Sequence, residues 1–378
     1  MNPLISVFVP TKNRYVFLKE FVNLVEGYKD PRIELVVQDN SDDNAEIVVF
    51  LKSRALVSTR YFYSNEKMSM SENSNLAFSH CTGDYVCMMG DDDAVCRNIA
   101  DCAMWMKDND IDAIRASEVQ LIYEGKGSDI LYYEPVTPTC KWLDPEKEVK
   151  KILRKGLADF GNIAKVYHGI VKRSVLLEFM NNNNKKTIFP GCTPDMSGSM
   201  VASMNVKKFV KLGIPVILPG LSNANSGGLS GQILTLNEVP WITQETRDNW
   251  EKKIPRIWAR EFIWPESGSK GLRYCGRDDM LDKYMDYYMT RCRYMIMHKQ
   301  HRKEVIATSP SKLKLFFAFI WTVLTVGGRF FFKRKVLAKL NHRMNGVYEY
   351  THDCHSVAEA EKYLFEKGCY HSFGQIKV

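Results

Sequence analysis

Short apolar, β-branched runs alternate with amphipathic segments through the first ninety residues. Residues 4–10 (LISVFVP), 33–37 (IELVV) and 85–89 (YVCMM) each have the composition and length of a buried strand. Between them, 15–28 and 72–81 carry apolar residues at helical spacing. Strands that alternate with helices in this way predict an α/β domain with a mostly parallel sheet flanked by helices.

Polar residues follow three of these strands at the point where each strand ends. The clusters are TKNR at 11–14, DNSD at 39–42 and DDD at 91–93. In parallel α/β sheets, ligands bind outside the carboxyl ends of the strands. We therefore expect the three clusters to converge on one crevice, which is the predicted functional site.

The triplet Asp91, Asp92 and Asp93 concentrates negative charge at a strand end. Carboxylates in such a position can hold Mg²⁺ or Mn²⁺, which usually complete their ligand shell with substrate phosphates and water. The same residues also suit an acidic turn before a helix, because aspartate is favoured at helix N-termini. The triplet alone leaves both interpretations open.

The chain changes character after residue 235, where helical patterns replace the alternation of strands and helices. We expect long amphipathic helices over roughly 241–264 and 277–303. The expected organisation is a sheet domain at 1–235, a helical extension at 236–304, a basic apolar segment at 305–345 and a helical tail at 346–378.

The basic charge of the chain lies near its C-terminal end. Residues 1–250 contain 28 Lys and Arg against 31 Asp and Glu, whereas the remaining residues contain 24 against 13. No basic region followed by a long apolar core and a cleavage site begins the chain, so we expect no secretory signal and a cytoplasmic location. A basic face of this kind indicates nucleic acid or an anionic membrane as partner.

The segment 313–332 (LKLFFAFIWTVLTVGGRFFF) favours the membrane. Its uninterrupted apolar or threonine-containing core is twelve residues long, whereas a spanning helix needs about 20. Residues 299–343 carry eleven Lys and Arg and one acid, which is typical of a helix lying on an anionic membrane surface. We expect peripheral attachment to the inner face of the cell membrane and no nucleic-acid partner. A buried core helix with a solvated basic flank is the alternative.

Three ordered motifs carry a resemblance to a known family. They are VFVPTKNR at 7–14, VVQDNSDD at 36–43 and SENSNLAFSHCTGDYVCMMGDDD at 71–93. Together they resemble the GT-A glycosyltransferases of family 2, over about the first 230 residues. The resemblance implies a GT-A fold, which is a Rossmann-like and mostly parallel sheet, with a helical extension behind it in this chain. It also implies a nucleotide-sugar donor and Mn²⁺ or Mg²⁺ as cofactor.

The resemblance also implies roles for individual residues in the three motifs. Asp39 would bind the base, Asp91 would lie near the ribose, Asp92 would bind the metal, and Asp93 would support it. Gly90 stands where the family's DxD motif begins, which departs from the pattern and leaves open which two carboxylates serve. The residues placed around the nucleotide are Pro10, Thr11, Asn13, Arg14 and Asn73.

An inverting transfer needs a base that takes the proton from the attacking hydroxyl. The stretch CTPDMSGSM at 192–200 resembles the family variant in which this acid follows a proline, which nominates Asp195. A helix cap is the alternative role for Asp195. His168 is a candidate contact to the acceptor, and Ser226 and Gly227 belong to a glycine-rich loop that can act as a lid.

These features predict an inverting glycosyltransferase that moves a sugar from a nucleotide diphosphate, UDP-sugar being the commonest donor in the family. The membrane segment suggests a lipid-linked glycan acceptor, as in the assembly of bacterial surface polysaccharides. A metal-dependent nucleotidyltransferase is an alternative, although the glycine-rich triphosphate loop that it would need after the first strand is missing from PTKNR. The third hypothesis is a catalytically silent GT-A scaffold at the membrane.

Overall fold

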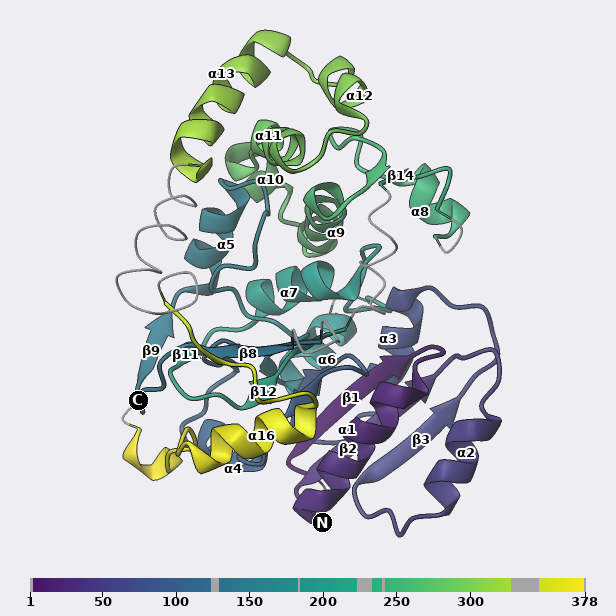
Figure 1. Ribbon diagram of the computed structural model, residues 1–378. Helices are drawn as coiled ribbons and strands as arrows, with labels where there is room; N and C mark the ends of the chain where they lie inside the picture. Colours follow the sequence, from purple (N-terminus) through teal and green to yellow (C-terminus); the bar gives the residue numbers. More distant parts are fainter. Residues whose placement is uncertain are drawn as a thin grey trace.

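The computed structural model describes residues 3–123, 129–182, 184–222, 233–239, 242–327 and 347–376. A central sheet with helices packed against it is continued by a layer of helices (Figure 1). The sheet region contains β1 (Ile5–Thr11), α1 (Tyr15–Tyr28), β2 (Ile33–Asp39), α2 (Ala45–Lys52), β3 (Thr59–Tyr63), α3 (Met70–Ser79), β4 (Tyr85–Met88), β5 (Ala94–Val95), α4 (Ile99–Asp108), β6 (Ala113–Arg115), β7 (Val119–Tyr123), β8 (Ile130–Tyr133), β9 (Cys140–Leu143), α5 (Pro145–Leu153), β10 (Ile170–Lys172), α6 (Arg173–Asn182), α7 (Pro194–Asn205), β11 (Phe209–Leu212), β12 (Ile217–Leu218) and β13 (Gly220–Ser222).

The remaining elements form the extension and the C-terminal segment. They are β14 (Leu234–Thr235), α8 (Gln244–Asp248), β15 (Ile257–Trp258), α9 (Arg260–Tyr274), α10 (Asp278–Tyr284), α11 (Tyr287–Met297), α12 (Arg302–Ala307), α13 (Lys312–Thr322), a π-helical turn (Val323–Gly327), β16 (Glu349–Thr351), α16 (Val357–Glu366) and a 3₁₀ turn (Phe373–Gln375).

The central sheet has the order β3-β2-β1-β4-β10-β6-β11-β9. The first four strands are parallel to one another, and β10 is antiparallel to both of its neighbours, β4 and β6. Two successive reversals leave β6 parallel to β4, so β1, β2, β4 and β6 end at the same edge of the sheet. The predicted α/β class with a mostly parallel sheet and a helical C-terminal part is therefore confirmed.

The apolar runs of the sequence become strands because the sheet buries both of their faces. All seven residues of β2 are buried, and β1 differs only at its partly exposed proline. The α1 helix has the predicted bounds, and its apolar side chains Leu18, Phe21 and Val22 are buried in the same core. Burial of both strand faces is what parallel sheets require. It also fixes the register that pairs Thr11 with Asp39 at the carboxyl edge.

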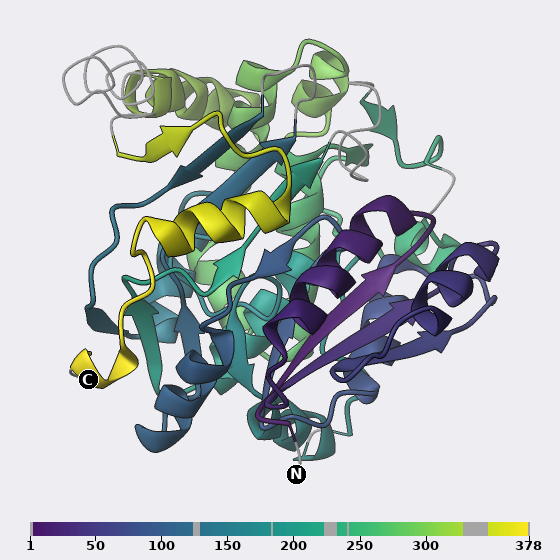
Figure 2. The same cartoon turned by 60° about the horizontal axis from the view of Figure 1, so that its bottom comes forward.

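The C-terminal segment returns to the sheet region (Figure 2). Strand β16 pairs with β8 in a second sheet of order β13-β7-β8-β16, and α16 packs against α1. The carboxylate of Glu361, which is buried, accepts hydrogen bonds of 2.8 and 2.7 Å from Nε and Nη2 of Arg97. A buried carboxylate with a bidentate guanidinium partner ties the end of the chain to the loop before α4.

The expectation of two long helices at 241–264 and 277–303 is wrong. The structure contains the shorter helices α8 to α12 in this region, with β15 among them. Pro255 lacks a backbone donor, and the next residues pair with β14 as a strand. Gly276 adopts a left-handed φ of +69° after α9, and Asp286 caps α11. Helical periodicity did not reveal these interruptions.

Helix α9 of the extension packs directly on α7 of the sheet region (Figure 1). The contact needs glycine, because a Cβ atom on Gly271 would lie 2.7 Å from the Cβ of Met200. A Cβ atom on Gly268 would lie 3.1 Å from Cγ of Met196, which is also on α7. The two helices therefore approach too closely for side chains at these positions, and the extension is fixed against the helix that carries Asp195.

Helix α13 has one buried face and one exposed apolar face. Leu315 and Thr322 are buried, and the helix packs against α11. Phe317 and Trp321 are 62% and 64% exposed. Among the described residues, no helix is long and apolar enough to cross a membrane. The buried face fits the alternative of a core helix, whereas the membrane contact expected of this segment stays a prediction.

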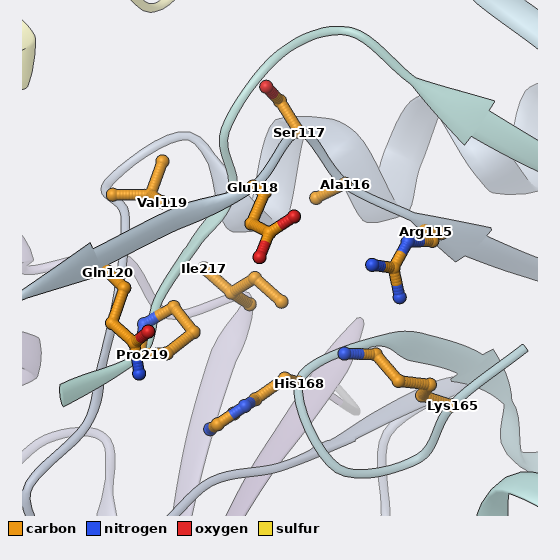
Figure 3. A pocket seen from close by; sticks show the side chains of 10 residues that line it. All are labelled: Arg115, Ala116, Ser117, Glu118, Val119, Gln120, Lys165, His168, Ile217 and Pro219. Atoms are coloured by element: carbon orange, nitrogen blue, oxygen red, sulfur yellow. The ribbon is translucent and has the colours of Figure 1, made fainter. Parts of the chain in front are cut away.

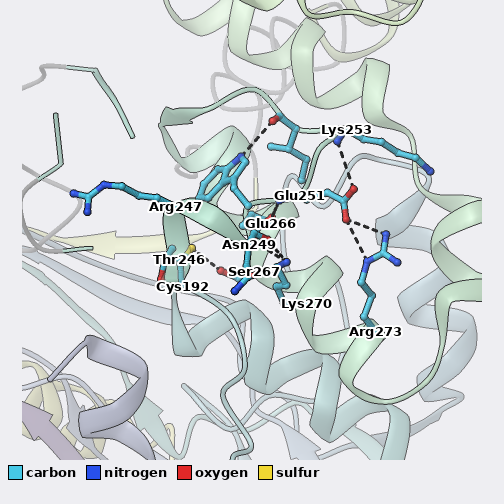
Figure 4. A network of polar contacts seen from close by, with 12 residues as sticks. Cys192, Thr246, Arg247, Asn249, Glu251, Lys253, Glu266, Ser267, Lys270 and Arg273 are labelled. Atoms are coloured by element: carbon cyan, nitrogen blue, oxygen red, sulfur yellow. Dashed lines mark hydrogen bonds and ion pairs between the residues drawn. The ribbon is translucent and has the colours of Figure 1, made fainter. Parts of the chain in front are cut away.

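A buried carboxylate network joins α9 to the loop before it (Figure 4). Glu266 is 2% exposed and accepts a 2.8 Å hydrogen bond from the backbone N–H of Glu251. The Glu251 carboxylate in turn pairs with Arg273 at 2.9 Å. Burial raises the pKa of Glu266 to about 7, although the Lys270 ammonium at 3.8 Å opposes this shift.

We expect Glu266→Gln to stabilise the protein at pH 8 and to change little at pH 5. Between its ordinary pKa near 4.5 and the folded value near 7, the folded chain retains a proton that the unfolded chain loses, so this residue costs stability as the pH rises. Glutamine keeps the acceptor for Glu251 without that cost. Chemical denaturation should show a gain of about 2 kcal/mol at pH 8. The exposed Glu245→Gln is the control, and an equal effect at both pH values would contradict the assignment.

Candidate functional site

The three predicted polar clusters meet at the carboxyl edge of the sheet. The hydroxyl of Thr11, at the end of β1, donates a 2.7 Å hydrogen bond to Oδ2 of Asp91, which follows β4. Asn13 has a left-handed φ of 57°, and its backbone N–H donates to Oγ of Ser41 at 2.7 Å. The Asn13 side chain exchanges two hydrogen bonds with Asp42. The convergence predicted from the strand ends is therefore present.

Asp39 lies at the end of β2 and is fully buried. Its Oδ2 accepts hydrogen bonds of 2.8 Å from the Tyr15 hydroxyl and 2.7 Å from the Tyr61 hydroxyl. Its Oδ1 accepts a 2.8 Å bond from the backbone N–H of Ser41. The sequence analysis missed both tyrosines, because nothing in their local pattern distinguishes a carboxylate partner from a core aromatic. Pro10 precedes this edge within β1 and pairs with Gln38.

Asn73 joins the ends of β1 and β2 from the first turn of α3. The helix begins with a capping box between Ser69 and Glu72, which fixes its start. Nδ2 of Asn73 lies 3.4 Å from the carbonyl oxygens of both Thr11 and Gln38. Its buried Oδ1 accepts no hydrogen bond from the described residues. Asn73 therefore offers an unused acceptor at the crevice.

Arg14 lies between the first two aspartates of the triplet. Its guanidinium is 3.0 Å from Asp91 and 2.8 Å from Asp92. Ser222, on β13, donates its hydroxyl and its backbone N–H to Oδ2 of Asp92, at 2.6 and 3.1 Å. Burial raises the pKa of Asp91 to about 7, against the lowering effect of Arg14. Oδ1 of Asp91 accepts no hydrogen bond from the described part of the chain.

Asp93 has a different set of partners. Nε2 of His168 lies 2.6 Å from its Oδ2, and the N–H groups of Gly90 and Gly220 donate to the carboxylate at 2.6 and 2.7 Å. Burial alone would raise the pKa of Asp93, but His168 and the two N–H donors hold it below its ordinary value. Asp93 is fully buried, so its charge is balanced by fixed donors rather than by water.

Gly90 has a steric role at the position where the family motif has its first aspartate. A Cβ atom there would lie 3.0 Å from Oδ2 of Asp93, 3.2 Å from Oδ1 of Asp92 and 3.2 Å from the Tyr167 hydroxyl. The Tyr167 ring stacks on His168 at 3.8 Å between centroids. The absence of a side chain at Gly90 therefore lets the carboxylates and the Tyr167–His168 pair close on one another.

Asp195 lies at the start of α7, after Pro194. Its Oδ1 accepts a 2.7 Å hydrogen bond from the backbone N–H of Met196, and its Oδ2 accepts a 2.9 Å bond from the indole N–H of Trp264. Burial raises the pKa of Asp195, while these donors and the charge of His168 lower it. Trp264 lies on α9, and no local signal in the sequence connects it to α7.

Tyr167 connects Asp195 electrostatically with the aspartate triplet. Burial raises the pKa of its hydroxyl, and the charges of Asp93, Asp92 and Asp195 raise it further. His168 likewise interacts with both Asp93 and Asp195. The structure thus brings the predicted base, His168 and the triplet into one site. The other two predicted residues, Ser226 and Gly227, lie outside the described residues.

The described residues contain no group of three or more His, Cys, Asp or Glu placed to hold a metal ion. The triplet spreads its carboxylates toward different partners, with Arg14 on Asp91 and Asp92 and His168 on Asp93. Oδ1 of Asp91 lies 3.0 Å from Nη1 of Arg14, so a metal at this oxygen would replace the guanidinium. Oxygen donors of this kind suit Mg²⁺ or Mn²⁺.

Comparison with known proteins places the first third of the chain in a family. Residues 6–126 match the family described as "Glycosyl transferase family 2". The GalNAc(5)-diNAcBac-PP-undecaprenol beta-1,3-glucosyltransferase of Campylobacter jejuni subsp. jejuni serotype O:2 (strain ATCC 700819 / NCTC 11168) is 31% identical over 93 residues. This match covers 24% of the present chain and 30% of the relative.

Two solved structures are similar at lower levels. S. aureus TarS 1-349 in complex with UDP-GlcNAc has 14% identity and a TM-score of 0.48, and covers 97% of this chain and 93% of its own. The mannosyltransferase PcManGT from Pyrobaculum calidifontis, in complex with GDP-Man and Mn²⁺, has 14% identity and a TM-score of 0.38, with coverage of 86% and 88%. The match of residues 6–126 to the family does not depend on these two structures. Residues 6–126 match glycosyltransferase family 2, the family that the motifs of the sequence resemble.

We expect Gly90→Ala to destabilise the protein by about 1–2 kcal/mol, because the new methyl group would press on two carboxylates and a tyrosine hydroxyl. Gly27→Ala in α1 is the matched control, since its Cβ would meet nothing within 4 Å. The control should gain about 0.5–1 kcal/mol from helix propensity. Thermal unfolding measures both changes, and two variants of equal stability would contradict the steric role of Gly90.

Proposed function

We propose that the protein is an inverting glycosyltransferase that moves a sugar from a nucleotide diphosphate, UDP being the preferred nucleotide, to an acceptor hydroxyl. One observation carries the proposal: in the region that matches glycosyltransferase family 2, the polar ends of β1, β2 and β4 meet at one edge of the sheet, where Thr11 and Arg14 contact Asp91. Displacement at a sugar carbon needs a base that faces the leaving group. Asp195 is the proposed base, and its charge acts on the same Tyr167 hydroxyl as the charges of Asp92 and Asp93.

The nucleotide sugar would bind along the ends of β1, β2 and β4. Asp39 would contact the base, Asp91 would lie near the ribose, and Arg14 would meet the diphosphate. The unused acceptor atom of Asn73 supports this placement, because buried polar atoms without partners are uncommon in folded proteins. The other proposed contacts come from the same edge of the sheet and are Pro10, Thr11 and Asn13.

Asp92, together with Asp91, would hold Mn²⁺ or Mg²⁺, which when bound offsets the charge of a diphosphate leaving group. Arg14 occupies this pair of carboxylates in the structure and would then turn toward the phosphates. Both oxygens of Asp93 are already hydrogen-bonded. We therefore assign Asp93 the supporting role of orienting His168 and the loop at Gly220, and not the role of main ligand.

Asp195 would take the proton from the acceptor hydroxyl. Its raised pKa makes it a stronger base than an exposed aspartate, and the Trp264 indole holds the carboxylate in place. The acceptor is proposed to be a lipid-linked glycan of bacterial surface-polysaccharide assembly. The name of the Campylobacter relative contains a lipid-linked acceptor, and the exposed apolar face of α13 gives an independent reason to place the protein at a membrane.

The decisive experiment separates chemistry from binding. Asp195→Asn should lower the rate of sugar transfer by about 10²–10⁴-fold, the usual contribution of a general base. It should still bind UDP in the presence of Mn²⁺, measured as an increase in thermal stability. Asp92→Asn should lose the Mn²⁺-dependent part of that increase.

The exposed Glu366→Gln serves as the control for surface charge. Transfer by Asp195→Asn within tenfold of the unaltered protein would contradict the role of the base. If UDP, GDP and dTDP all leave the thermal stability unchanged, with and without Mn²⁺, the enzyme proposal fails and the scaffold reading gains support.

Membrane attachment through α13 has its own test. The double variant Phe317→Glu/Trp321→Glu should bind vesicles that contain anionic lipid at least tenfold more weakly, because two exposed aromatic side chains become charged. The control is Val16→Glu/Val49→Glu, which adds the same charge at residues 78% and 70% exposed elsewhere. Co-sedimentation measures both, and equal losses in the two variants would contradict a specific docking face.

A further inference from the structure

A cavity of about 120 Å³ lies beside His168 and is bordered by two basic side chains (Figure 3). Arg115 is the last residue of β6, and Lys165 belongs to the loop before β10. Glu118 and Gln120 line the same space from the strand region that follows Arg115. In Figure 3 the guanidinium of Arg115 and the ammonium of Lys165 both point toward the opening between these side chains.

Neither cation forms an ion pair with a carboxylate of the described chain. Nη1 of Arg115 is buried without a hydrogen bond. The Lys165 ammonium lies 5.3 Å from the centre of the Phe160 ring, a contact that does not neutralise its charge. Glu118 faces the same space, but its contact is a 3.1 Å hydrogen bond from the Tyr348 hydroxyl. Both residues are partly buried. Partly buried cations are usually paired, because desolvation of an unpaired charge is costly. Two of them at one cavity indicate a ligand with negative charge.

The electrostatics of the cavity agree with this conclusion. Burial lowers the pKa of Lys165 to about 7, and the charge of Arg115 lowers it further, while Glu118 raises it. An anion between the two cations would remove their mutual repulsion and favour the charged form of Lys165. A single water takes about 30 Å³, so the space is large enough for a carboxylate or a phosphate group.

Topology places the cavity next to the proposed chemistry. Because β6 runs parallel to β4, Arg115 lies at the edge of the sheet that carries the aspartate triplet. β10 separates the two strands, so Arg115 lies away from the β1 and β2 ends proposed for the nucleotide. His168 lines the cavity and also contacts Asp93. An anion in the cavity would therefore belong to a sugar at the reacting centre.

We propose that Arg115 and Lys165 bind an anionic substituent, a carboxylate or a phosphate, carried by one of the two sugar substrates. The inference rests on the proposed glycosyl transfer and narrows its substrate class to acidic sugars. The acidic group can belong to the acceptor or to the donor sugar, since the two sugars meet at the reacting carbon. Gln120 and Glu118 would contact the neutral hydroxyl groups beside it.

The test uses the full-length protein with Arg115→Gln and Lys165→Gln. Both variants should fold, because each removes an unpaired charge rather than a bonded one. The control is Lys172→Gln, which removes a surface ammonium paired with Asp110. For the acceptor source, the probes are glucuronic acid and glycerol phosphate, titrated by calorimetry in the presence of saturating UDP, with glucose and glycerol as neutral matches. For the donor source, UDP-glucuronic acid is compared with UDP-glucose.

We expect the unaltered protein to bind the acidic member of at least one pair at least tenfold more tightly, and both variants to lose that preference while the control keeps it. The pair that shows the preference identifies the source of the anion. Equal binding of acidic and neutral probes, or a preference that survives in both variants, overturns the inference. A separate titration with UDP alone distinguishes this outcome from failure of the proposed function, which would abolish nucleotide binding itself.

Discussion

The site depends on balancing three adjacent carboxylates that are almost completely removed from water. Like charges in such a place destabilise a fold unless cations or hydrogen-bond donors compensate them. Different groups compensate the different carboxylates. Arg14 serves Asp91 and Asp92, whereas His168 and two backbone N–H groups serve Asp93. Arg14, His168 and Gly220 come from three separate segments of the chain, so the charge balance also holds these segments together around the triplet.

The helical extension takes part in this arrangement through packing. Close contact between α7 and α9 depends on glycines that admit no side chain, and it brings Trp264 to the carboxylate of Asp195. The hydrogen bond from Trp264 fixes the orientation of the Asp195 carboxylate, so this orientation depends on the position of α9. The boundary at 235 therefore separates regions of different sequence character, while the site draws on both. Residues 347–376 add a strand to the second sheet and a helix that packs against α1.

Charge without a partner is as informative as charge that is balanced. Arg115 and Lys165 contrast with Arg14, because neither meets a carboxylate among the described residues. The exposed aromatic face of α13 is the apolar counterpart, since its other face is satisfied by packing on α11. In both places the protein leaves uncompensated groups at a surface or cavity. At these positions, packing and charge pairing within the fold do not account for the residue types that are present.

The sequence by itself determined the α/β class, the bounds of α1, and the three strands whose ends form the crevice. Period and strand-end chemistry are local properties, and both faces of β1 and β2 had to be apolar to be buried. The partners of the site residues were decided only by the tertiary structure. Arg14 meets Ser222 across 208 positions, and Trp264 meets Asp195 across 69. Such pairs depend on register, loop closure and helix packing, which no local pattern records, and the same limit explains why the helices after residue 241 were predicted too long.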